Sequence, residues 1–374
     1  MDRVPDSLAL VLTGGGARAA YQVGVLRCLA RRLPDTRLDI ITGVSAGAIN
    51  ALFLASRRAP LADVVEELRE VWRTLELKNV IRIDSRSLAR NVFGWGASGS
   101  RVQGLVDTTP LRKLLEQLFP SSPGGEITGL AENLARCEPK AVAITTLDYT
   151  TGQTVTWTAG CDIPMWERPL RRSVLTTLII DHVLASAALP IVFPAVHLGK
   201  HWHGDGGIRL SAPLSPALHL GATRMLAIST HYAKSFSEAD EPQVIGYPPP
   251  AQILGQLMDA IFLDVMDEDA VRMQAANAFL RDLPPQERHG YRPIDFAVIR
   301  PSQDLGTLAA DYEPQLPRAF RFLTRSLGTR ETSNADFMSL FLFVPDYLNR
   351  LIEIGEADAE ARIADITRVA TPRH

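Results

Sequence analysis

A serine between two glycines is the residue best suited to chemistry in this chain. Ser45 stands in a Gly-Val-Ser-Ala-Gly segment, with Gly43 and Gly47 two positions to either side. A run that favours a strand (38–42) precedes it, and an apolar, helix-compatible run (46–55) follows. A sharp strand-to-helix turn strains such a serine and exposes its hydroxyl, and the glycines leave room for the bend and for a substrate. The segment therefore predicts a nucleophile at Ser45.

Three consecutive glycines form a second candidate element. Gly14, Gly15 and Gly16 follow a continuous apolar run (8–12). Successive backbone N–H groups of a glycine loop at the mouth of a helix can bind developing negative charge, and glycine lets a substrate approach the main chain closely. If two parallel strands are neighbours, this loop lies beside the serine turn. The loop is thus a candidate oxyanion hole.

A dinucleotide-binding loop is the alternative interpretation of the same glycines. Gly14 and Gly16 with Ala19 match that fingerprint loosely. The fingerprint also requires an acidic residue at the end of the next strand, where it binds the ribose. The next strand here ends in Thr42 and Gly43 instead. The sequence therefore favours the oxyanion loop, and we expect no cofactor.

Histidine and aspartate alternate near residue 205. On a strand, His201, His203 and Asp205 would share one face, as metal ligands can. No comparable His, Asp or Glu group elsewhere completes such a site, so we expect no metal. Asp205 followed by Gly206 and Gly207 fits a carboxylate on a tight, open turn that a substrate can reach. A simple turn without function is the alternative.

The elements that must position these residues alternate between strand and helix. The chain opens as strand, glycine loop, helix, strand, serine turn and helix, a pattern typical of an α/β layered fold. Later runs predict strands at 141–146, 154–158, 225–229 and 296–300 and helices at 61–77 and 181–188. After the strand at 296–300 the chain looks helical to its end.

Composition excludes several classes of function. The chain has 374 residues and a net charge of −3, which gives no reason to expect a nucleic-acid partner. The sequence contains no run of 18 apolar residues, so we expect no transmembrane segment. The first residues lack the basic region of a signal peptide. We expect a cytoplasmic protein, with secretion by a signal-less route left open. The three scattered cysteines favour buried thiols over a disulfide framework.

Three stretches allow two interpretations each. Small residues around two aromatics make 84–107 a candidate lid or channel insert, or else a plain surface connector. The basic stretch 166–172 could touch anionic headgroups, although a solvated surface is the favoured reading. The apolar stripe 253–265 is expected to be core rather than a lipid-docking face.

Four motifs together resemble the patatin-like phospholipase family, in that family's order, over residues 7 to 230. They are the glycine loop with its arginine (14–18), the serine turn (43–47), an Ala-Ser-Ala-Ala-Leu-Pro segment (185–190) with Phe193-Pro194, and the Asp-Gly-Gly turn (205–207). The resemblance implies a three-layer α/β/α fold with a central, mostly parallel sheet. It also implies a catalytic domain at 1–302. The tail is similar to that of a bacterial subgroup with a helical C-terminal extension, which predicts such an extension at 303–374.

The resemblance further implies a Ser–Asp dyad. Ser45 would attack an ester carbonyl, Asp205 would accept the hydroxyl proton, and the glycine loop would hold the oxyanion. Arg18 would fix that loop or add positive charge. A free carboxylate near pKa 4 is a weak base, so we expect Asp205 in a poorly solvated place close to Ser45. The implied partner is a phospholipid or lysophospholipid ester, with peripheral membrane contact as an open expectation.

Other functions use the same residues. The machinery would equally serve a soluble carboxylesterase or thioesterase. A non-catalytic module could hold an anion or nucleotide in the glycine loop. His203 could replace Asp205 as the base of a triad, but two residues apart on a strand the two side chains would project side by side rather than in a line toward Ser45.

Overall fold

The computed structural model describes most of the chain. It covers residues 6–82, 104–240, 247, 253, 256, 265–317, 320–321 and 336–372. The strands are β1 (Leu8–Leu12), β2 (Ile40–Val44), β3 (Ala141–Asp148), β4 (Gln153–Gly160), β5 (Glu167–Arg168), β6 (Arg171–Leu175), β7 (Val196–Leu198), β8 (His201–Asp205), β9 (Arg224–Ile228) and β10 (Asp295–Ile299).

Helices connect these strands and cover the sheet. Those up to β8 are α1 (Ala20–Arg32), α2 (Ala46–Ser56), α3 (Leu61–Arg73), α4 (Leu77–Val80), α6 (Thr109–Leu118), α7 (Thr128–Leu134) and α8 (Ile180–Ser186). Those after β8 are α9 (Ser215–His219), α10 (Phe236–Ala239), α12 (Val265–Asp282), α13 (Leu305–Ala310), α15 (Asp336–Ser339), α16 (Pro345–Ala361) and α17 (Ile363–Ala370). Short 3-10 turns include η1 (Gly16–Ala19) and η3 (Gly206–Arg209).

One mixed, mostly parallel sheet organises the described residues. Its order is β10-β9-β1-β2-β3-β4-β6-β5, and β8 joins β3 while β7 joins β8. The strands from β10 to β3 run parallel, whereas β4 is antiparallel to β3. Parallel neighbours bring the ends of β1 and β2, and so the loops that follow them, to one edge of the sheet.

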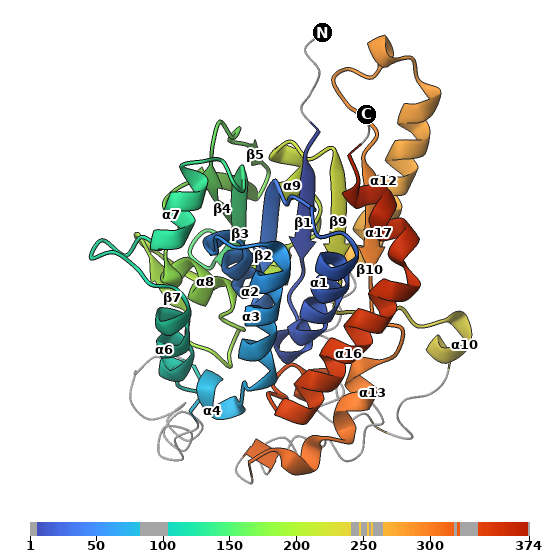
Figure 1. Cartoon of the computed structure of the whole chain (residues 1–374). Helices are drawn as coiled ribbons and strands as arrows, with labels where there is room; N and C mark the ends of the chain where they lie inside the picture. The colour runs from blue at the N-terminus through green and yellow to red at the C-terminus, as the bar shows by residue number, and fades with distance from the viewer. Residues whose placement is uncertain are drawn as a thin grey trace.

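Alternate residues along the strands enter two separate cores. In β1, Leu8, Leu10 and Leu12 pack under α1, α2 and α3, whereas Ala9 and Val11 pack against α9 and α12. Helices therefore cover both faces of the sheet, and α16 lies beside α1 on the first face (Figure 1). The predicted α/β/α arrangement is confirmed.

Most predicted elements appear with small shifts. The first strand has the predicted bounds, the second begins two residues later than expected, and the helix after Ser45 is present. The helix predicted at 61–77 ends at Arg73, and the separate short helix α4 begins at Leu77. No helix among the described residues is both long and apolar enough to cross a membrane.

The expectation of three unpaired thiols is wrong. Cys137 and Cys161 form a disulfide, with 5.8 Å between their Cα atoms, and Cys28 is free and buried. The pairing follows from the β3–β4 hairpin, in which Ala141 is opposite Gly160. Residues just before β3 and just after β4 are therefore neighbours, which the sequence spacing alone does not reveal.

Two predictions fall largely on residues that are not described. The candidate lid 84–107 lies outside the described residues except for 104–107, and the stripe 253–265 is described only at positions 253, 256 and 265. The predicted boundary at residue 302 follows β10. Side chains from both sides of that boundary share one hydrophobic cluster, in which α16 packs against α1. The division into 1–302 and 303–374 stays a prediction.

Candidate active site

Ser45 occupies a strained turn between β2 and α2. Its backbone has φ 56° and ψ −132°, a conformation that residues other than glycine rarely adopt. A Cβ at Gly43 would lie 2.5 Å from the Gly47 carbonyl oxygen, and one at Gly47 would lie 2.3 Å from the Thr13 carbonyl oxygen. Both positions therefore require glycine, and the sharp turn predicted from the sequence is present.

The glycine loop lies directly beside this serine. A Cβ at Gly14 would fall 2.9 Å from Ser45 Cβ and 3.6 Å from Ser45 Oγ. Gly15 and Gly16 have φ values of 142° and 55°, which favour glycine strongly. Within the described part of the chain, the amides of these three glycines donate no hydrogen bond. The loop thus offers backbone donors near the Ser45 hydroxyl.

The register of β3 brings residues 45 and 205 together. Val44, at the end of β2, is opposite Thr145, and Asp205, at the end of β8, is opposite Thr146. Because β4 occupies the other edge of β3 along its whole length, β2 and β8 lie end to end along one edge. Val44, which precedes Ser45, and Asp205 are therefore opposite consecutive residues of β3, so Asp205 lies next to the serine turn.

Asp205 is fully buried, and burial changes its acidity. Its Oδ1 atom accepts a hydrogen bond from the Gly207 amide at 2.8 Å. Burial raises the pKa of the carboxyl group to about 7, although the Ser45 hydroxyl and the Gly207 amide both lower it. The Ser45 hydroxyl is thus close enough to the carboxyl group to change its pKa. No hydrogen bond of regular geometry joins Ser45 Oγ to Asp205 Oδ2.

The turn after Asp205 also requires glycine. A Cβ at Gly206 would lie 2.2 Å from the Thr145 carbonyl oxygen, because the chain just after β8 lies directly against β3. Gly207 supplies the amide that holds the carboxylate. Asp205 is therefore less open to solvent than the turn predicted from the sequence, but it is poorly solvated and close to Ser45, as its expected chemistry requires.

Ser186 and Ala188 have structural roles that the sequence did not reveal. The Ser186 hydroxyl accepts a hydrogen bond from the Ser45 amide at 2.9 Å and donates one to the Thr145 carbonyl oxygen at 2.7 Å. The Ala188 carbonyl oxygen accepts a hydrogen bond from the Asp205 amide at 2.9 Å. The Ala-Ser-Ala-Ala-Leu-Pro segment therefore ties the serine and the aspartate to the same sheet edge, which explains why it accompanies the other motifs.

The two histidines near Asp205 are held by other partners. His201 Nδ1 lies 2.6 Å from Asp148 Oδ2, and His203 Nδ1 lies 3.1 Å from Thr146 Oγ1. Burial lowers the pKa of His203. Within the described ranges, no three His, Cys, Asp or Glu side chains are grouped so that they could hold a metal ion.

Arg18 forms an ion pair with a distant part of the chain. Its side chain is buried and pairs with Asp336, with 2.6 Å between Arg18 Nη2 and Asp336 Oδ1. The cation therefore contacts a segment near the C-terminal end of the chain. Of the two roles that the sequence left open for Arg18, this contact favours fixing the loop.

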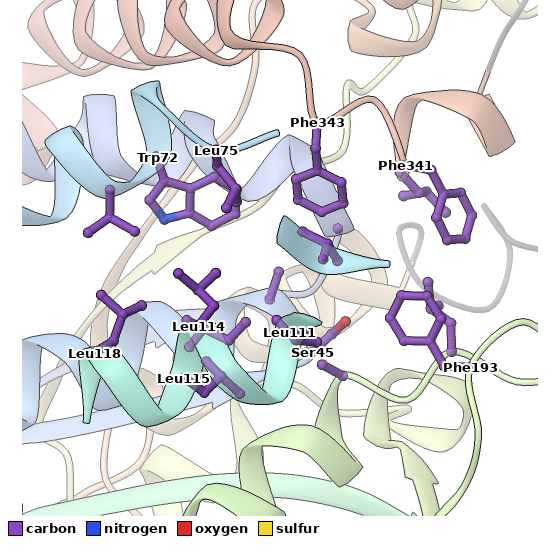
Figure 2. A pocket seen from close by; sticks show the side chains of 18 of the residues that line it. Ser45, Trp72, Leu75, Leu111, Leu114, Leu115, Leu118, Phe193, Phe341 and Phe343 are labelled. Atoms are coloured by element: carbon purple, nitrogen blue, oxygen red, sulfur yellow. The ribbon is translucent and has the colours of Figure 1, made fainter. Parts of the chain in front are cut away.

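An apolar pocket opens beside Ser45. Its walls come from α3, α6, the loop after α8 and the segment after α15 (Figure 2). Among the described side chains that line it, only those of Ser45 and Trp72 carry polar atoms. The Trp72 indole N–H donates a hydrogen bond to Asn50 Oδ1 at 2.8 Å. Trp72 and Leu118 lie at one end and Phe193 at the other, with Ser45 between them (Figure 2).

The sequence motifs and this geometry agree with a family model. The model described as patatin-like phospholipase matches residues 10–218, which is more than half of the chain. The chain therefore belongs to the patatin-like phospholipase family, as the resemblance of its motifs indicated.

Relatives with curated names are phospholipases. Calcium-independent phospholipase A2-gamma of Mus musculus is 27% identical over 215 residues, an alignment that covers 56% of this chain and 25% of that protein. The cGAMP-activated phospholipase of Pseudomonas aeruginosa is 26% identical over 222 residues, which is 59% of this chain and 58% of that protein. The chain thus aligns with about a quarter of the first protein and just over half of the second.

Similar solved structures are distant. Human GIVD cytosolic phospholipase A2 has a TM-score of 0.45 at 13% identity, covering 99% of this chain and 61% of that chain. VipD from Legionella pneumophila has a TM-score of 0.39 at 14% identity, covering 96% of this chain and 67% of that chain. At these scores the likeness carries no argument about the site.

Proposed function

We propose that this protein hydrolyses acyl esters of phospholipids or lysophospholipids with a Ser45–Asp205 dyad. The observation that carries the proposal is the burial of Asp205 beside Ser45. Burial gives the carboxylate a pKa of about 7, so it can accept a proton from a serine at neutral pH. Membership of the family and the names of the relatives support the same class of reaction.

The reaction would proceed in two displacements. Ser45 Oγ attacks the ester carbonyl carbon while its proton passes to the Asp205 carboxylate. The amides of Gly14, Gly15 and Gly16 stabilise the oxyanion that forms. Asp205 then protonates the leaving alcohol, which leaves an acyl group on Ser45. Water then attacks the acyl-enzyme. Asp205 accepts a proton from this water and passes it to Ser45 Oγ as the bond to the acyl group breaks, which releases the carboxylic acid.

The pocket supports a fatty acyl group as the part of the substrate that is bound. The described residues of its walls are almost entirely hydrocarbon, so these residues offer little to a polar acid but remove a methylene chain from water. The carbonyl carbon would stand at Ser45, with the chain running between α3 and α6. A long-chain lipid ester therefore fits this site better than a short, water-soluble ester, and the substrate would be drawn from a membrane surface.

Hydrolysis of phospholipid vesicles tests the proposal. Wild-type protein should release fatty acid from phosphatidylcholine vesicles, and Ser45→Ala and Asp205→Asn should each lose at least ~1,000-fold in rate. Ser56→Ala is the matched control, because Ser56 is a buried serine at the far end of α2 from Ser45. Full activity in either site variant would refute the dyad.

A soluble esterase with the same dyad remains the second candidate. It is distinguished by comparing butyrate and palmitate esters with the vesicles. Preference for the butyrate ester and failure on vesicles would favour that function over lipid hydrolysis. A fluorophosphonate probe that labels Ser45 would exclude the third candidate, a module that only binds an anion or nucleotide.

A further inference from the structure

The glycine loop is anchored to a segment far outside the range matched by the family model. Arg18 Nε donates a hydrogen bond to Ser339 Oγ at 2.6 Å. Arg18 Nη2 donates to Asp336 Oδ1 at 2.6 Å and to the Asp336 carbonyl oxygen at 3.2 Å. The family match ends at residue 218. These two partners of the arginine therefore lie on a part of the chain to which the family motifs assign no role.

The backbone of the same segment touches the loop at its tightest point. The Ala17 amide donates a hydrogen bond to the Leu340 carbonyl oxygen at 2.9 Å. A Cβ at Gly16 would lie 2.2 Å from that same oxygen. The loop is thus fixed to this segment twice, by the Arg18 side chain and by the Ala17 backbone amide. Both contacts are made by residues 336–340, which form the first part of segment 336–344.

Segment 336–344 also forms one wall of the apolar pocket. Leu340, Phe341 and Phe343 line the cavity, and the Phe341 and Phe343 side chains face it in Figure 2. The Phe343 carbonyl oxygen accepts a hydrogen bond from the Leu77 amide at 3.0 Å, which holds the far end of the segment. The pocket is therefore incomplete without this segment.

We infer that Asp336 and Ser339 are positioning residues for catalysis, which act through Arg18 to hold the loop amides of Gly14–Gly16 against Ser45. This inference rests on the proposed hydrolase function. Amides that stabilise an oxyanion must already point at it before reaction, because any reorientation adds to the barrier. A buried guanidinium that loses its carboxylate must find other partners or water, and the loop that carries it would move.

Full-length Asp336→Asn and Ser339→Ala variants test the inference on a soluble ester, p-nitrophenyl butyrate. Active sites are first counted by titration with a fluorophosphonate, so that misfolded protein does not enter the rate. We expect kcat per titrated site to fall ~10-fold for Asp336→Asn and by a smaller factor for Ser339→Ala, with KM changed less than about twofold. Asp346→Asn is the control, because Asp346 is an exposed acid on the same part of the chain that bonds Gln315.

A purely structural role would reduce the number of titrated sites and leave kcat per site unchanged. That result in both variants would overturn the inference. If Asp336→Asn does not fold, Ser339→Ala decides alone, because it removes one neutral hydroxyl and keeps the ion pair. Failure of the serine-hydrolase chemistry looks different, since wild-type protein would then neither titrate with the probe nor hydrolyse the ester. Failure of lipid hydrolysis alone would show in the vesicle assay and leave this comparison intact.

Discussion

The backbone amide of Ser45 donates a hydrogen bond to the side-chain oxygen of Ser186 over 2.9 Å. The two residues are 141 positions apart, and both are buried. Because the Ser186 hydroxyl also donates to the Thr145 carbonyl oxygen, it connects the serine turn to β3 at the residue opposite the last residue of β2. The strained turn at Ser45 is therefore supported from outside its own segment.

Ser186→Ala should weaken both the fold and the reaction. The substitution leaves the Ser45 amide and the Thr145 carbonyl oxygen buried without this partner, which costs about 1–3 kcal/mol in the free energy of unfolding. The turn would also lose a constraint, so we expect kcat to fall by roughly 10-fold. Urea denaturation and ester hydrolysis measure the two effects. A variant with wild-type kcat would show that Ser186 supports the fold alone.

The rate should depend on the protonation of Asp205. Burial places the pKa of this base at about 7, and only the carboxylate can accept the serine proton. We therefore expect kcat/KM to fall tenfold per pH unit well below pH 7 and to level off above it. A pH–rate profile measures this directly. His203→Gln is the control, and disappearance of the inflection in that variant would assign it to the histidine instead.

The same carboxylate should make the fold less stable as pH rises. The pKa of Asp205 is about 7 in the folded chain and 3.8 for an unperturbed aspartate, the value that applies to the unfolded chain. At a pH between these values, the carboxyl group is protonated in the folded state and ionised in the unfolded state. The free energy of unfolding therefore falls with pH across this window, by at most about 1.4 kcal/mol per unit from this group.

Asp205→Asn removes this titration and keeps an oxygen for the Gly207 amide. The variant should be inactive yet gain stability relative to wild type as pH rises from about 4 to 7, with a constant difference above pH 7. Urea denaturation at four pH values measures the difference. A gap that stays flat from pH 4 to 8 would contradict the raised pKa.

The local parts of the site could be predicted from the sequence. The strand, turn and helix around Ser45 are encoded within about 20 residues, and Gly43 and Gly47 mark the sharp turn because no other residue fits there. The close packing of the glycine loop against Ser45 could be predicted for the same reason. The need for a poorly solvated Asp205 could be argued from the acidity of a free carboxylate alone.

Contacts between distant segments could not be predicted in this way. The pairing of Arg18 with Asp336 spans 318 positions and involves two common residue types, so no local pattern marks it. Ser186 belonged to a motif that was visible, but its role depends on the register of β3, which fixes where β2 ends and β8 begins. The disulfide was missed because hairpin pairing, rather than cysteine spacing, brings its ends together.

The apolar pocket should decide which acyl chains react. Leu114 lines it from α6, so Leu114→Trp would fill space that a long chain needs. We expect kcat/KM for a palmitate ester to fall at least ~10-fold relative to a butyrate ester. Lys113→Trp is the control, because Lys113 is exposed on the same helix and does not line the pocket. Equal losses on both esters would place the acyl chain elsewhere.

The most direct test of the dyad is to map the residue that a fluorophosphonate modifies. The protein is treated with the probe, digested and analysed by mass spectrometry, beside Asp205→Asn. The dyad predicts one stoichiometric adduct on the peptide that contains Ser45, formed at least ~100-fold more slowly in Asp205→Asn. An adduct on another residue, or equal rates of modification in the two proteins, would contradict it.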